Sequence, residues 1–187
     1  MLVEAGFVRA RDGEGVEYTF TPSFVKIASL GTPHEIVALY AGLHGPKAQT
    51  EAAYVLACLC DQEDPSSLIG HHDADGWWRP GTMPADHMII FARHLMRHGI
   101  VGTAQPGDGG GSFSPAFHAT EYIAAARVHL GLSSQDAEAL SMTEFQAMFE
   151  MKFPKAKGKA GEGDVPSRDE YRERIRMMEA KRGAEGR

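Results

Sequence analysis

Apolar side chains cluster in two short N-terminal segments, and they recur every three or four residues over much of the remaining chain. Residues 2–9 and 16–21 are rich in β-branched and aromatic side chains. The Asp12-Gly13 pair between them is a strong hairpin turn signal. From residue 22 onward the apolar spacing is helical. The pattern therefore predicts a small N-terminal β-hairpin followed by short helices.

Capping residues and helix breakers mark the ends of these helices. Thr32, followed by Glu35, forms a capping box, and Ser141 and Glu144 form a second one. Residues 70–82 are the least regular stretch and are predicted to form a loop or a second small hairpin. The predicted helical segments are residues 22–30, 33–43, 47–62, 84–98 (ended by Gly99), 114–130 (ended by Gly131), 133–139 and 142–153.

The end of the chain has a different character. Residues 155–165 are rich in Gly, Ala and Lys and cannot bury a core, which is typical of a linker. A third capping box at Ser167 opens a helix with only a thin apolar stripe. We therefore predict a mainly α protein whose short helices form one globular domain with an N-terminal β-hairpin. Its predicted parts are a helical body (1–153), a flexible linker (154–166) and a C-terminal amphipathic helix (167–187).

Composition places the chain among ordinary globular proteins. Hydrophobic residues make up 43% and charged residues 24% of its 187 residues, which excludes wholesale disorder. No apolar run approaches the roughly 18 residues that span a bilayer. The N-terminus lacks the basic start and apolar block of a signal peptide. We expect a cytoplasmic protein with no membrane partner.

Charge is distributed unevenly along the chain. Residues 1–154 carry 9 Lys and Arg against 18 Asp and Glu, whereas residues 155–187 carry 10 against 7. An acidic body repels phosphate backbones, so we expect no nucleic-acid partner for it. The basic end is suited to contact nucleic acid, an acidic protein surface or the body itself.

The sequence lacks the patterns of the common enzyme sites. Its glycine-rich run at 107–111 lacks the Gly-Lys-Ser/Thr of a phosphate-binding loop, and no Gly-x-Ser-x-Gly elbow occurs. Cys58 and Cys60 lie two apart on a predicted helix and point to nearly opposite sides, so we expect reduced, buried small hydrophobes. We expect neither enzymatic activity nor a cofactor.

Two histidines provide a metal-binding alternative. His94 and His98 lie four residues apart on one predicted helix, a spacing that lets two imidazoles reach one metal ion. A third ligand would have to come from elsewhere, with His71, His72 and Asp73 as candidates. The pair also flanks the apolar face of its helix, so packing at the edge of the core or at an interface is the interpretation we favour.

Several apolar residues are candidates for binding a partner. The C-terminal helix is marginal alone and should gain stability by docking on the body, on a second copy of the chain or on another protein. The Trp77-Trp78 pair beside Arg79 has the composition of an interface anchor. Alternatively, the two rings straddle a strand, one inward and one outward. The candidate partner-binding residues are Phe145, Met148, Phe149, Tyr171, Ile175, Met178, Trp77 and Trp78.

Two stretches of the chain resemble a known protein family. One runs from Tyr18 to Gly31, a strand followed by Pro-Ser and a helix that leads to glycine. The other joins Val128-His129-Leu130-Gly131-Leu132-Ser133 to Leu140-Ser141-Met142-Thr143-Glu144-Phe145. The middle, residues 41–102, is similar to an uncharacterised phage family in Gly81-Thr82-Met83-Pro84 and in residues 92–100.

The two stretches resemble phage tail assembly chaperones, and this resemblance implies a non-enzymatic function in phage tail assembly. Such a chaperone binds the tape-measure protein in the cytoplasm of the infected bacterium and shields it until tail-tube subunits polymerise around it. The resemblance implies no cofactor. A structural tail-completion or connector subunit that stays in the particle is one alternative. A metal-dependent enzyme that uses His94 and His98 is the other.

Overall fold

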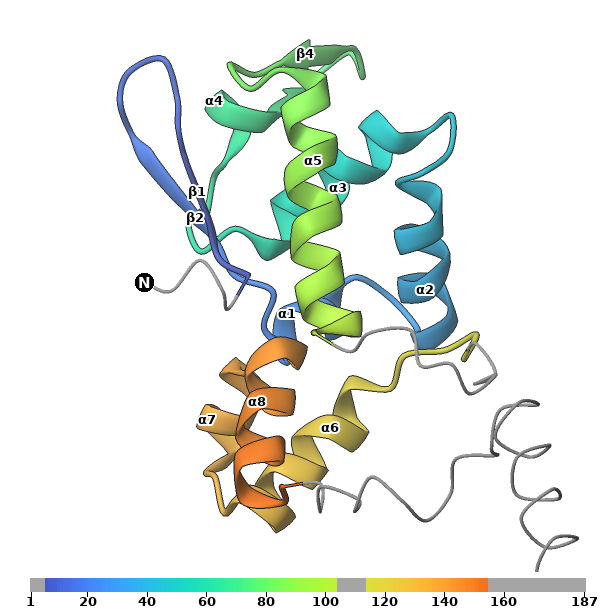
Figure 1. Cartoon of the computed structure of the whole chain (residues 1–187). Helices are drawn as coiled ribbons and strands as arrows, with labels where there is room; N and C mark the ends of the chain where they lie inside the picture. The colour runs from blue at the N-terminus through green and yellow to red at the C-terminus, as the bar shows by residue number, and fades with distance from the viewer. Residues whose placement is uncertain (1–5, 104–113, 155–187) are drawn as a thin grey trace, which may run out of the picture. The chain divides into compact units, whose positions relative to one another are not determined.

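The chain is mainly helical and carries a small N-terminal β-hairpin, as the sequence predicts (Figure 1). The computed structural model describes residues 6–103 and 114–154. The chain divides into two compact units, Met1–Phe153 and Pro154–Arg187. Beyond Pro154, the predicted linker and C-terminal helix lie outside the described residues. Within the described ranges, none of the helices has the length and apolar character that crossing a membrane requires.

Eight α-helices, two π-helical turns and four strands make up the described residues. They are β1 (Val8–Arg11), β2 (Glu17–Phe20), α1 (Phe24–Ser29), α2 (Pro33–Gly42), α3 (Ala48–Leu59), α4 (Ser66–Ile69), β3 (Gly70–His72), β4 (Trp78–Pro80), α5 (Ala85–Met96), the π-helical turn η2 (Arg97–Val101), α6 (Ala119–Ala125), the π-helical turn η3 (Ala126–Leu130), α7 (Ser134–Ala139) and α8 (Met142–Lys152).

β1 and β2 pair as an antiparallel hairpin whose turn is held by Asp12. The Asp12 carboxylate accepts hydrogen bonds from two backbone N–H groups of the turn. It also accepts a hydrogen bond of 2.8 Å from the Ser67 hydroxyl of α4, which ties the hairpin to the body and lowers the pKa of Asp12. The predicted turn is confirmed. The first strand, Val8–Arg11, overlaps the predicted range 2–9 only at residues 8 and 9, and residues 2–5 lie outside the described residues. Gly6, with φ +89, departs from extended geometry just before the strand.

A cluster of aromatic rings joins α1 to the C-terminal half of this unit. Phe24 of α1 is fully buried. Its ring stacks on Tyr122 of α6 with 5.7 Å between ring centres and meets Phe145 of α8 edge-on at 6.0 Å. The ring of Phe117 lies 6.4 Å away. α1 also contacts α3, α7 and η2, so the core is organised around this short helix.

Two cations connect the helices through their C-terminal ends. Lys26 of α1 donates to the last carbonyl oxygens of α3, those of Leu59 and Cys60, at 3.1 and 2.8 Å, and it pairs with Asp61. The Arg93 guanidinium of α5 donates two hydrogen bonds to the carbonyl that ends α2. A positive charge at the C-terminal end of a helix is favoured by the helix dipole. Both cations therefore stabilise helix ends that lie far from them in sequence.

Glycines act differently at the ends of two predicted helices. The prediction that the helix over 84–98 ends at Gly99 is wrong, because the chain continues through η2 to Gly102, where φ is +75. A Cβ at Gly99 would lie 2.6 Å from Cδ1 of Ile27. Gly99 therefore permits close packing against α1 and does not stop the helix. Gly131, also at φ +75, ends η3 as predicted.

The capping boxes of the body are confirmed. In both, the hydroxyl accepts a hydrogen bond from the N3 backbone, and the glutamate accepts one from the cap residue, at 2.7 Å for Thr32–Glu35 and 2.9 Å for Ser141–Glu144. Of the two alternatives for residues 70–82, the structure has the hairpin, β3–β4. α4 was not predicted, because four residues are too few to show a helical period.

Candidate binding surfaces

The last helix of the body carries an apolar surface that faces solvent. Rings run along α8 from the core outward: those of Phe145 and Phe149 are 5.5 Å apart, and those of Phe149 and Phe153 are 4.8 Å apart, between centres. Phe145 is 8% exposed, Phe149 is half-buried and Phe153 is 45% exposed. Met148 and Met151, also on α8, are 37% and 84% exposed. We call Met148, Phe149, Met151 and Phe153 the α8 ridge.

Both π-helical turns contact α8. From η3, the His129 ring lies edge-on to Phe149 and Phe153, with ring centres 6.1 and 6.2 Å apart. At the end of η2, the Gln146 amide of α8 donates to the carbonyl of Val101 and accepts a hydrogen bond from a backbone N–H at 2.8 Å. π-helical turns are uncommon and occur often at functional sites. Here they hold the helix that presents the ridge.

The predicted partner-binding residues of this helix separate into two groups. Met148 and Phe149 lie on the ridge. Phe145 packs in the aromatic core beside Phe24, so its ring is not available at the surface. The helical spacing places all three on neighbouring positions but does not say how deep each lies. The other three, Tyr171, Ile175 and Met178, lie outside the described residues.

The β3–β4 hairpin carries the two tryptophans. Its turn is held by Asp73, whose carboxylate accepts a hydrogen bond from the Trp77 backbone at 2.9 Å and pairs with Arg79 at 2.8 Å. Trp77 is 71% exposed. Trp78 is half-buried and meets the His72 ring edge-on, with 5.1 Å between ring centres. Of the two predicted alternatives, this geometry fits one ring inward and one outward.

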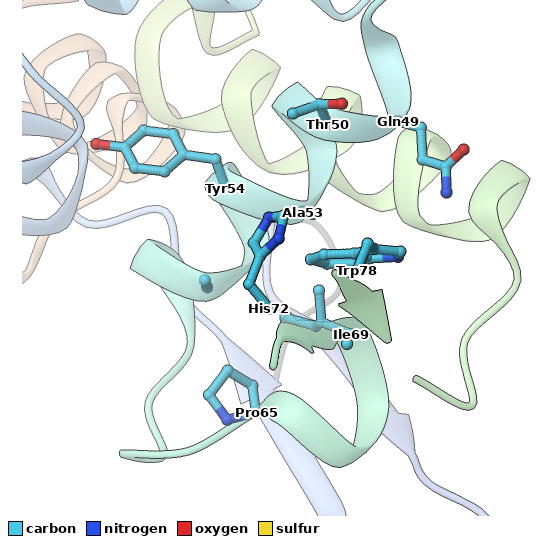
Figure 2. A pocket seen from close by; sticks show the side chains of 10 residues that line it. Gln49, Thr50, Ala53, Tyr54, Pro65, Ile69, His72 and Trp78 are labelled. Atoms are coloured by element: carbon cyan, nitrogen blue, oxygen red, sulfur yellow. The ribbon is translucent and has the colours of Figure 1, made fainter. Parts of the chain in front are cut away.

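A pocket of about 550 Å³ lies between α3 and this hairpin (Figure 2). One face of α3 forms one wall, and α4 with the hairpin forms the other, where Figure 2 shows His72 and Trp78 pointing toward α3. No Asp, Glu, Lys or Arg is among the lining residues. They are Gln49, Thr50, Ala53, Tyr54, Ala57, Pro65, Ile69, Gly70, His72 and Trp78. The volume is in the range of sites that bind small ligands.

The polar side chains of the pocket differ in which of their hydrogen-bonding atoms remain free. The Tyr54 hydroxyl donates to the Leu30 carbonyl at 3.0 Å and is engaged. Nδ1 of His72 lies 3.1 Å from a carbonyl oxygen of the hairpin turn. Because a carbonyl only accepts, Nδ1 carries the proton of the neutral imidazole, and Nε2 keeps a lone pair. The Gln49 and Thr50 side chains make no hydrogen bond to the described residues, so they too offer acceptors.

Sequence reasoning missed this pocket because it considered only the inward face of the helix over 47–62. Gln49 and Thr50 lie on the exposed face, where a polar residue carries no signal. Tyr54 is 46% exposed on the same face. An aromatic residue at a polar position of a helix was the signal that could have pointed to a wall of this kind.

His94 and His98 lie together at the junction of α5 and η2. Their ring centres are 4.5 Å apart, and Nδ1 of His98 lies 2.8 Å from the Thr143 hydroxyl of α8. Burial, with the nearby Arg97 charge, lowers the pKa of both imidazoles. Within residues 6–103 and 114–154, no three His, Cys, Asp or Glu side chains form a group that could hold a metal ion. His71, His72 and Asp73 therefore do not complete a site with the pair.

Both cysteines are free thiols in α3 and at its end. Cys58 is half-buried and Cys60 is buried. Burial raises the pKa of both thiols, which keeps them protonated near neutral pH. Their environment fits the expected small hydrophobes and does not suit a nucleophile.

Comparison with known proteins places the chain in a family. No curated protein and no solved structure matches it. The region that matches a family model includes the whole pocket and all of α8, and it leaves the N-terminal hairpin, α1 and α2 outside. Residues 45–172 match DUF6246, and the chain belongs to this family of unknown function.

Proposed function

We propose that this protein is a non-enzymatic assembly chaperone that holds an apolar helical segment of another phage tail protein, of the tape-measure type, against the α8 ridge. The observation that carries the proposal is the ridge itself. Met148 and Met151 on α8, and Phe153 directly after its last residue, are large apolar side chains exposed within six residues of the chain. The resemblance of residues 128–145 to tail assembly chaperones adds to it, because that stretch leads into the same helix.

The composition of the ridge suits a helical partner. Methionine is unbranched and polarizable, so it adapts to different partner side chains, and it is common on surfaces that bind varied apolar helices. Phe149, half-buried between His129 and Phe153, gives the surface a rigid centre. An apolar helix laid along the ridge would cover side chains that now face water.

The test is co-expression of the full chain with the tape-measure protein of the same phage genome. The soluble fraction of the tape-measure protein and its co-purification with the chain are measured. The Met148→Asp/Met151→Asp variant should lose both effects, because two charges would be buried against an apolar partner. Ile90→Asp, on α5, is the matched control, since Ile90 is 57% exposed outside the ridge.

Circular dichroism of each variant separates a binding defect from a folding defect. Equal co-purification with the double variant and with the wild type would refute the ridge as the binding surface. Presence of the chain in purified virions would favour the structural tail-completion or connector alternative. Stoichiometric metal by elemental analysis, lost in His94→Gln/His98→Gln, would favour the metal-dependent enzyme.

A further inference from the structure

We propose that the pocket between α3 and the β3–β4 hairpin binds an arginine side chain of a partner polypeptide. This inference is independent of the α8 ridge, since the two surfaces share no residue. The pocket combines three properties that a guanidinium needs: an aromatic wall, free hydrogen-bond acceptors and a negative surrounding charge.

The aromatic wall is Trp78. Its indole is half-buried, is held edge-on by His72 and points toward α3 (Figure 2). A planar guanidinium stacks on an indole face more favourably than on any other side chain. Ala53 and Ile69 line the remaining apolar part of the pocket, where the three methylenes of an arginine would be buried.

The free polar groups are suited to accept hydrogen bonds. Nε2 of His72 keeps a lone pair because Nδ1 donates to the hairpin turn. The Gln49 amide oxygen and the Thr50 hydroxyl, on the facing wall, make no hydrogen bond to the described residues. Guanidinium carries five N–H donors and no acceptor, so it matches this set. A neutral apolar side chain would make no use of these acceptors, which all belong to exposed residues.

The charge around the pocket selects a cation. Residues 45–83, which build it, contain two basic residues, Lys47 and Arg79, against six acidic ones. Arg79 is paired with Asp73 at 2.8 Å, and Asp61 is paired with Lys26 of α1, so four acidic residues remain against Lys47. The walls themselves carry no Asp or Glu, so a cation would bind there without an ion pair in the pocket, favoured by the acidic balance of the segment that builds it.

The experiment is an NMR titration of the full-length protein with three capped tripeptides that differ in the central residue. Ac-Ala-Arg-Ala-NH2 is the probe. Ac-Ala-citrulline-Ala-NH2 removes the charge and keeps the shape, and Ac-Ala-Lys-Ala-NH2 keeps the charge and removes the planar fork. The Trp77→Phe variant assigns the two indole N–H signals, because the chain has only two tryptophans.

The arginine peptide should shift the Trp78 indole signal and the pocket amides in a saturable manner, with a dissociation constant on the order of 1 mM. The citrulline peptide should bind about tenfold more weakly, the difference expected for loss of a partly desolvated cation–π contact. Added salt should weaken the binding of the arginine peptide and leave the binding of the citrulline peptide nearly unchanged.

Two variants make the result specific. Trp78→Leu should weaken the binding of the arginine peptide about tenfold. Trp77→Leu, at the neighbouring exposed position of the same hairpin, should leave that binding unchanged. Ala57→Arg places an arginine at an exposed lining position and should block the peptide without disturbing the core. It keeps the proposal testable if Trp78→Leu fails to fold.

Three results would overturn the proposal. One is the absence of a saturable shift with the arginine peptide. Another is equal binding of the arginine and citrulline peptides, which would identify a site for neutral groups. The third is binding that survives Ala57→Arg, which would place the peptide elsewhere. None of these results bears on co-purification through the α8 ridge.

Discussion

Phe24 lies outside the region that matches the family, yet it is at the centre of the aromatic core. Replacement by alanine removes a ring that is 0% exposed and that contacts the rings of Phe117, Tyr122 and Phe145. Phe→Ala in a core costs about 3–5 kcal/mol, since it combines lost transfer energy with a cavity. Three aromatic neighbours place Phe24→Ala toward the upper part of that range, at about 4–5 kcal/mol. Such a loss approaches the whole stability of many domains.

The measurement is urea unfolding followed by far-ultraviolet circular dichroism, with the free energy of unfolding extrapolated to water. Phe24→Leu keeps most of the apolar volume and should lose only about 1–2 kcal/mol, so it yields a folded variant for comparison. Val25→Ala is the control, because the neighbouring side chain is 49% exposed. A loss below about 1 kcal/mol for Phe24→Ala would refute the view that α1 is integral to the core.

Three further predictions concern helix ends, a turn and acid sensitivity. Lys26→Met should lower the free energy of unfolding by about 1–2 kcal/mol in the same urea assay, since the last carbonyls of α3 lose a charged donor. An unchanged unfolding midpoint would contradict the view that Lys26 stabilises the end of α3. Gly70→Ala should lower the melting temperature much more than Gly131→Ala does. Both glycines have positive φ, but a Cβ at Gly70 would lie 2.5 Å from a backbone oxygen, whereas a Cβ at Gly131 would meet open space. An equal drop in melting temperature for the two variants would contradict this steric explanation. Because burial lowers the pKa of His94 and His98 below 6.5 in the folded protein, the unfolded chain takes up these protons first as the pH falls. The melting temperature should stay constant above pH 6.5 and fall below it, and the fall should be smaller in His94→Gln/His98→Gln. If the melting temperatures of the variant and the wild type fell in parallel, this histidine pair would not be the cause.

The binding surfaces were only partly predictable. The apolar spacing in residues 142–153 identified Met148 and Phe149, because neighbouring apolar residues on an amphipathic helix are visible in sequence. It included Phe145 as well, since spacing alone does not distinguish a ring in the core from one at the edge. Tyr54 on the exposed face of α3 could have indicated one wall, but the pocket itself could not be predicted, because Gln49 and Trp78 are brought together only when the β3–β4 hairpin folds back toward α3.

Local signals in the sequence determined most element boundaries of the described residues. Thr32 and Ser141 open helices because each cap bonds backbone groups within three residues of itself. Asp12 closes its turn for the same reason. Tertiary structure alone decided the role of Gly99, which lies within a helix that runs on to Val101 and where α1 approaches too closely for a side chain. Such features depend on contacts between segments far apart in the chain, whose approach is set by packing and not by local conformational preference.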